Sequence, residues 1–142
     1  METLAIFERW HGGEIPPIAK LIGFRLLRFE PGHVVFELDA GPQHANPMGT
    51  LHGGILCDLG DAAMGTATAT TLREGETFTT LELKINFVKP VWTARLNAVG
   101  RVLRRGRTIV LTESEITDEG GSLVAKLSGS CMILRGADAV GR

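Results

Sequence analysis

The chain has 142 residues, a length that suits one domain with its own hydrophobic core, and its formal net charge is only −1. This balance gives no strong field to attract nucleic acid or acidic lipid, and the 44% apolar and 22% charged content is ordinary for a soluble globular protein. No apolar run approaches the roughly 18 residues that a membrane helix needs, so we expect no nucleic-acid partner and no membrane partner.

The first residues of the chain predict a helical lead-in over residues 1–22. Apolar residues occupy most of residues 4–10, which favours a short helix that ends at Gly12. Pro17 starts a second short turn over residues 18–21. The lead-in lacks a basic segment followed by an apolar run, so we expect no signal peptide and a cytoplasmic location.

A hairpin and a long helix are predicted next. Two β-rich runs, residues 24–30 and 33–38, flank a Pro-Gly pair and predict the hairpin. A polar loop covers residues 41–51, and residues 53–71 form the long helical candidate, made almost entirely of Gly, Ala, Thr, Ile, Leu and Met. A helix that is apolar on almost every face is a buried helix.

The second half of the chain predicts strands. Strand-like segments lie at residues 77–87, 95–104, 108–117 and 122–134. The polar tail at residues 135–142 is expected to fray. The sequence therefore predicts a single α+β domain over residues 1–142, with an antiparallel five- or six-stranded sheet wrapped around one long central helix, which a partner chain covers.

The cysteines and histidines give no sign of a metal site or a disulfide. Cys57 and Cys131 are the two cysteines, and we expect both to be reduced core thiols. The four histidines are scattered without the spacing of metal ligands, so we expect no metal.

The most informative segment, residues 46–54, runs directly into the predicted helix. The first amides of a helix carry partial positive charge and have no partner within it, and Gly53 has no side chain to keep a ligand oxygen away. Asp61 lies two turns further along. A helix N-terminus that binds an oxyanion, together with a carboxylate, is typical of acyl transfer or hydrolysis.

From residue 23 to residue 134 the chain resembles the hotdog-fold acyl-CoA thioesterases of the phenylacetic-acid-degradation (PaaI-like) type. Residues 79–90 resemble their strand and Phe-x-Arg/Lys-Pro turn, and residues 104–108 resemble their third hairpin. The main motif is carried by Asn46, Pro47, Gly49, His52, Gly53, Gly54, Leu59, Asp61 and Ala63. The resemblance implies a hotdog fold and hydrolysis of an aryl- or medium-chain acyl-CoA to a free acid and CoA.

The resemblance also implies the central catalytic roles. The Gly53 amide would polarise the thioester carbonyl, and Asp61 would act as general base for water or as nucleophile. Asp58 is the competing carboxylate, and the family position nine residues after His52 selects Asp61. A lone carboxylate in an apolar helix is costly without a purpose, and burial raises its pKa towards the working range of a base.

Three further residues are candidates for supporting roles, each with a structural alternative. Asn46 would hold the attacking water or the thioester, or is an ordinary turn residue. His52 would contact the substrate or, as we favour, shape the loop. Thr80 would orient the water, although Thr79 is its neighbour and both residue types are common in strands.

Binding of coenzyme A is expected from Gly54 and from basic residues, because Arg binds phosphate in a bidentate manner. The alternative for these basic residues is a solvated hairpin tip. The candidates are Gly54, Lys89, Arg104, Arg105, Gly106 and Arg107. Coenzyme A is part of the substrate, and no cofactor is expected.

The spacing of Gly53 and Asp61 predicts a site shared between two chains. Eight residues on one helix correspond to about 12 Å along the axis and roughly 80° around it, so one carbonyl carbon cannot lie within ~3 Å of both groups. The expectation is a two-fold homodimer with two shared sites. The resemblance implies that such dimers pair into a homotetramer.

Two other functions are compatible with this architecture. An acyl-thioester hydratase or dehydratase would need an Asp/His or His/Glu pair, and His52 and Asp61 fail the same distance test. An acyl-CoA-binding regulatory module would need a further domain, for which 142 residues leave no room.

Overall fold

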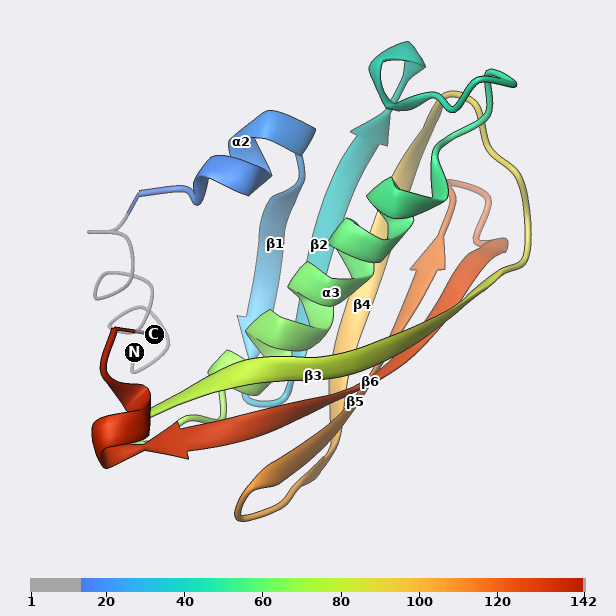
Figure 1. Cartoon of the computed structure of the whole chain (residues 1–142). Coiled ribbons are helices and arrows are strands. Elements are labelled where there is room, and N and C mark those ends of the chain that lie inside the picture. Colours follow the sequence, from blue (N-terminus) through green and yellow to red (C-terminus); the bar gives the residue numbers. More distant parts are fainter. Residues whose placement is uncertain (1–13, 142) are drawn as a thin grey trace.

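Six strands form one antiparallel sheet in the order β1-β2-β4-β5-β6-β3, and the sheet curves around the helix α3 (Figure 1). The computed structural model describes residues 14–141, so the helix predicted at residues 4–10 lies outside the described part. The elements are α2 (Pro17–Ile22), β1 (Arg25–Glu30), β2 (His33–Ala40), η1 (Pro42–His44), α3 (Gly53–Ala69), β3 (Glu76–Phe87), β4 (Ala94–Arg105), β5 (Ile109–Thr117), β6 (Leu123–Arg135) and η2 (Gly136–Ala139).

The predicted elements agree with the structure apart from their ends. The predicted antiparallel sheet around one helix is confirmed, with six strands. Helix α3 ends at Ala69, two residues before the predicted end, because the Thr70 and Thr71 hydroxyl groups bond to the preceding turn. The tail is expected to fray from residue 135, but Arg135 still belongs to β6, and the exposed turn η2 follows it.

Small residues allow α3 to lie close to the sheet. A Cβ atom added to Gly100 of β4 would stand 2.2 Å from the Ala63 carbonyl oxygen. A Cβ atom on Gly60 would stand 2.4 Å from the Leu127 side chain of β6. The buried side chains of Leu59, Ala63 and Ala67 complete this contact and form the centre of the core.

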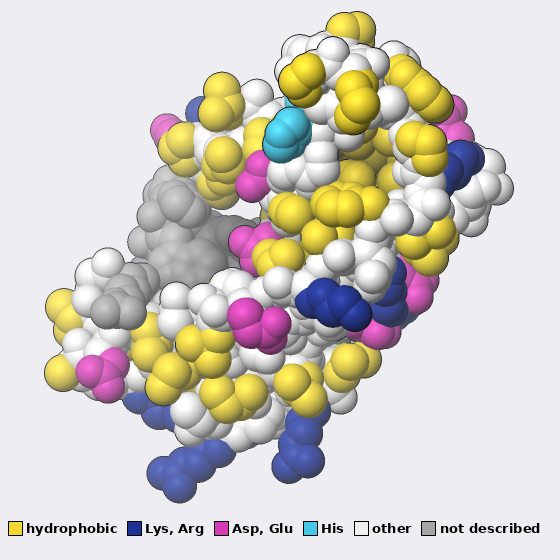
Figure 2. Space-filling view, turned by 45° about the vertical axis from the view of Figure 1, so that its right-hand side comes forward, with side chains coloured by type: hydrophobic (Ala, Val, Ile, Leu, Met, Phe, Trp, Pro, Cys, Tyr) yellow, Lys and Arg dark blue, Asp and Glu magenta, His cyan; other side chains and the backbone are white. Residues whose placement is uncertain are grey.

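The helix α3 has two different faces. The face against the sheet is fully buried, whereas Cys57, Asp58, Asp61, Ala62 and Gly65 on the opposite side keep part of their surface exposed. Figure 2 shows apolar side chains on this side of the molecule with acidic groups among them. Cys131 is the buried thiol that the sequence predicts, but Cys57 is only half-buried because it lies on the uncovered face.

One of the two edge strands of the sheet, β3, lies beside that uncovered face. Strand β3 pairs with β6 on one side, and its other side bonds to no strand of residues 14–141 (Figure 1). Leu81, Phe87 and Val88, on or next to β3, are exposed apolar side chains. No helix within the described part of the chain is long and apolar enough to cross a membrane.

Candidate active site

The loop before α3 is closed by its own hydrogen bonds. The Asn46 side chain accepts the backbone N–H groups of Met48 at 2.9 Å and Thr50 at 3.2 Å, and it donates to the Thr50 hydroxyl at 2.6 Å. The Asn46 N–H bonds to the Thr50 carbonyl at 2.7 Å. All these partners lie within the loop. The Asn46 side chain therefore makes the hydrogen bonds that are typical of a turn residue.

A buried histidine that sequence reasoning did not single out anchors the same loop. The His44 Nδ1 accepts the Gly41 N–H at 3.2 Å, and Nε2 therefore carries the proton that reaches the Ile22 carbonyl at 2.7 Å. The His44 carbonyl accepts the His52 N–H at 2.8 Å. His44 thus ties the end of α2 to the start of α3, and only its contacts across the fold distinguish it from a surface residue.

His52 is the N-cap of α3. Its Nδ1 accepts the Gly54 N–H at 2.9 Å, and its carbonyl accepts the Ile55 N–H at 3.0 Å. A Cβ atom on Gly54 would stand 2.9 Å from the same Nδ1, so the cap needs glycine there. This is the structural role that the sequence favours for His52, and it occupies the Gly54 amide.

The Gly53 amide stays available at the end of the helix. No acceptor within residues 14–141 bonds to its N–H, whereas the neighbouring His52, Gly54 and Ile55 amides all have partners. The Phe87 ring, 58% exposed, covers the α-carbon, and a Cβ atom on Gly53 would lie 2.7 Å from it. Gly53 therefore presents one unpaired donor at the positive end of α3.

Asp61 lies two turns further along α3, at a pocket of about 220 Å³. The Thr80 hydroxyl of β3 donates to the Asp61 carboxylate at 3.4 Å, so the fold brings these two predicted site residues together. Burial raises the pKa of Asp61, the Thr80 hydrogen bond opposes that shift, and the nearby Asp58 charge adds to it. The pocket is lined by Asp61, Ala62, Gly65, Thr66, Phe78 and Thr80.

The competing residues have less suitable positions. Asp58 is exposed and lies outside the pocket lining, although partial burial raises its pKa as well. Thr79 is half-buried beside Thr80, but the hydroxyl that reaches Asp61 belongs to Thr80. The pKa of the Cys57 thiol is raised, mainly by burial and further by the Asp58 and Asp61 charges. A raised pKa disfavours the thiolate that a nucleophile would need.

The candidate coenzyme A contacts have unequal surroundings. The Arg105 guanidinium is largely buried and donates to the Glu76 carboxylate and to the Gly106 carbonyl, both at 2.6 Å. Lys89 is ion-paired with Asp118 at the β5–β6 turn. Gly106 forms the β4–β5 turn, where a Cβ atom would stand 2.4 Å from the Ile109 carbonyl oxygen.

Arg107 differs from Arg105 because no acidic partner within residues 14–141 pairs with its side chain, and it differs from the similarly unpaired Arg104 because it lines a pocket. It lines an open, polar pocket of about 570 Å³ together with the basic residues Arg73 and Arg135 and the acidic residues Glu74 and Glu76. No cluster of three His, Cys, Asp or Glu side chains suited to a metal ion occurs in the described residues.

Known proteins are similar to this chain in sequence. The Thioesterase superfamily family model matches residues 48–125. A Saccharolobus solfataricus protein named "Putative esterase SSO2140" is 36% identical over 118 residues, which are 83% of this chain and 84% of that protein. Human acyl-coenzyme A thioesterase 13 is 29% identical over 103 residues, 71% of this chain and 73% of that one.

Solved structures agree with these relatives. The PaaI protein of the Escherichia coli phenylacetic acid degradation operon superposes with a TM-score of 0.84, at 21% identity, covering 95% of this chain and 96% of its own. The PA5202 protein of Pseudomonas aeruginosa superposes with a TM-score of 0.80 at 32% identity, covering 84% and 95%. The chain therefore belongs to the thioesterase superfamily and is a thioester hydrolase with the hotdog fold.

Proposed function

We propose that the protein hydrolyses an aryl- or medium-chain acyl-CoA to the free acid and CoA, in an active site that two subunits share. The observation that carries the proposal is the half-buried Asp61 carboxylate, which faces a pocket, accepts the Thr80 hydroxyl and has a raised pKa. The free Gly53 amide supplies the complementary donor. The reaction needs no cofactor beyond the CoA of the substrate.

The proposed reaction uses these two groups in sequence. The thioester carbonyl oxygen accepts the Gly53 N–H, and Asp61 takes a proton from a water molecule as that water attacks the carbonyl carbon. The tetrahedral intermediate then collapses, its C–S bond breaks, and the CoA thiolate leaves and takes up a proton. An oxyanion-hole donor of this kind typically contributes ~3 kcal/mol to transition-state stabilisation.

A site shared between two subunits is supported by the separation of Gly53 from Asp61 within one chain. Gly53 does not line the pocket at Asp61, and eight residues of helix, about 12 Å, separate the two residues. The uncovered face of α3 and the free edge of β3 lie together, and they give a second copy of the chain a sheet edge to extend. A two-fold axis there brings the Gly53 amide of one subunit to the Asp61 of its partner.

Among the basic residues, we assign CoA phosphate binding to Arg107. Its guanidinium has no ion-pair partner in the described part of the chain and lies at an open pocket, whereas the Arg105 guanidinium already serves Glu76. Phosphate recognition favours an available planar guanidinium.

The test is steady-state hydrolysis of a panel of aryl- and acyl-CoA esters, with released thiol as the readout. Wild type should turn over at least one ester, Asp61→Asn should lose 100-fold or more, roughly the contribution of a general base, and Asp58→Asn should keep most activity. Equal losses in both variants would contradict the assignment of Asp61. Tight binding of CoA esters without any turnover would instead indicate a regulatory acyl-CoA-binding protein.

A further inference from the structure

A further pocket, of about 410 Å³, lies between α2 and α3, over the hairpin of β1 and β2. Eight of its eleven lining residues are apolar, and its volume falls within the roughly 300–1,000 Å³ of small-molecule sites. The Phe24 and Phe36 rings contribute to its wall and meet edge to face, with centroids 5.7 Å apart.

This pocket adjoins the pocket of the candidate base. Ala62 and Thr66 of α3 line both, and Ala62 directly follows Asp61 in the chain. A group that enters from Asp61 therefore passes over Ala62 and Thr66 into an apolar space. The carbonyl carbon of a thioester must lie beside the base. Its acyl part can then extend over Ala62 and Thr66 into this pocket.

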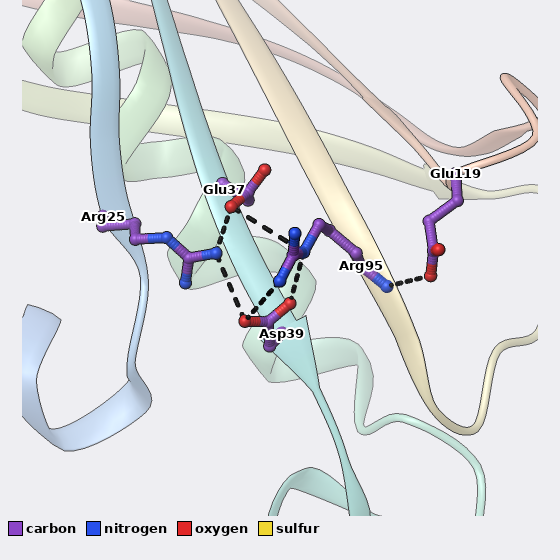
Figure 3. Close-up of polar contacts among 5 residues, drawn as sticks. All are labelled: Arg25, Glu37, Asp39, Arg95 and Glu119. Atoms are coloured by element: carbon purple, nitrogen blue, oxygen red, sulfur yellow. Dashed lines mark hydrogen bonds and ion pairs between the residues drawn. The ribbon is translucent and has the colours of Figure 1, made fainter.

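The charged residues of the pocket do not make it a site for a charged group. Arg25 lines the pocket, but its guanidinium is directed to Glu37 and Asp39 of β2, and Arg95 shares the same carboxylates (Figure 3). The other charged lining residue is Glu14, which repels anions. A terminal carboxylate on the acyl group would therefore find no free cation among the lining residues.

The outer wall of the pocket is the short helix α2, which the fold holds in a defined position. Pro16 and Pro17 set its start, Gly23 ends it with a positive φ of 98°, and His44 binds its last carbonyl at 2.7 Å. Ile18 faces the pocket from this helix, whereas Leu21, 81% exposed, is absent from the lining.

We infer that this pocket receives the acyl group, that α2 limits its length and bulk, and that the substrates are uncharged, apolar acyl-CoA esters. The inference rests on the proposed function and adds to it a specificity wall and a substrate class. Dicarboxylic acyl groups are excluded by the same surfaces, since burying an unpaired carboxylate in an apolar pocket is costly.

The experiment compares wild type with Ile18→Trp and with the matched control Leu21→Trp. Each is assayed for kcat/KM on straight-chain esters from butanoyl- to dodecanoyl-CoA, and on phenylacetyl- and glutaryl-CoA. Ile18→Trp fills the pocket and should lower kcat/KM for the long and aryl esters by about tenfold or more relative to butanoyl-CoA. Leu21→Trp should leave the profile unchanged, and wild type should disfavour glutaryl-CoA relative to hexanoyl-CoA.

Identical profiles for Ile18→Trp and Leu21→Trp, in an active enzyme, would overturn the inference and leave the proposed function intact. Ile18→Ala, which enlarges the pocket, should shift the preference to bulkier acyl groups and covers the case in which Ile18→Trp fails to fold. If wild type hydrolyses no ester, the proposed function fails. The dissociation constants of non-hydrolysable thioether analogues then test the pocket alone, and the inference requires Ile18→Trp to abolish their dependence on chain length.

Discussion

At the scale of single residues, the chemistry depends on how one carboxylate is surrounded. Burial raises the pKa of Asp61, and the Thr80 hydroxyl partly offsets this because its hydrogen bond favours the charged form. The proposed base needs its deprotonated form, so we expect activity to rise as the pH increases through the pKa of Asp61. By this reasoning, the Thr80 hydroxyl should extend the active range towards acid.

Removal of that hydroxyl should move the acid limb of the pH profile. In Thr80→Val the Asp61 carboxylate loses a donor, its pKa rises further, and kcat/KM should begin to increase only at a higher pH than in wild type. The measurement is kcat/KM against pH. Thr79→Val, on the same strand but without this bond, is the control, and an unmoved limb in Thr80→Val would argue against the proposed pairing.

Two arginines of the β4–β5 hairpin should differ in the kind of defect they produce. Arg107→Met should raise KM for CoA esters by about three- to tenfold with little change in stability, because it removes the proposed phosphate contact and the side chain is exposed. Arg105→Met should instead lower the free energy of unfolding by about 1–3 kcal/mol, since it leaves the buried Glu76 with one guanidinium fewer. Urea denaturation and steady-state kinetics on both variants separate the two roles. A loss of stability in Arg107→Met together with a raised KM in Arg105→Met would contradict both assignments.

At the scale of elements, the contact between α3 and β4 is limited by backbone atoms. The space at Gly100 is closed by the Ala63 carbonyl, which the helix hydrogen bonds hold in place, so the helix as a whole would have to move to admit a methyl group. The small residues of α3 are thus required by packing as well as by the site, and they explain why a helix of low intrinsic propensity is stable here.

Gly100→Ala should therefore destabilise the protein by about 1–3 kcal/mol or more, as overpacking of a core does. Gly120→Ala is a matched control, because a methyl group at this exposed turn would meet its nearest atom only at 3.5 Å. Thermal or urea unfolding followed by far-ultraviolet circular dichroism measures both. Equal stabilities of the two variants would show that α3 does not lie this close to the sheet.

At the scale of the whole molecule, the proposed active site requires two chains. In the single chain, one face of α3 and the outer edge of β3 are uncovered. The Gly53 amide and the Asp61 carboxylate lie apart on α3, and a two-fold partner would bring the Gly53 of one chain to the Asp61 of the other. The active species should sediment as a dimer or a tetramer, and an active monomer at assay concentration would contradict the proposal.

Complementation tests the sharing directly. Asp61→Asn and Gly53→Val chains with different tags are co-expressed, and the heterodimer is purified through both tags. One of its two sites then combines an intact Gly53 with an intact Asp61, so the heterodimer should show about half of wild-type activity, although each homodimer is inactive. An inactive heterodimer that assembles normally would place both groups in one chain.

The local sequence determined the elements and the candidate groups. Alternating β-rich runs, turn residues and the Gly pair before an apolar helix act over a few residues. They placed the hairpins and α3 correctly along the chain, and Gly53 is the first residue of that helix. The tertiary structure alone decided which side chains meet. Arg105 meets Glu76 across 29 residues, His44 meets Ile22, and Ala62 rather than the buried Leu56 or Met64 lines the pocket that adjoins α2. Such contacts depend on strand order and on the rotation of α3 against the sheet, which long-range packing sets and local propensity does not.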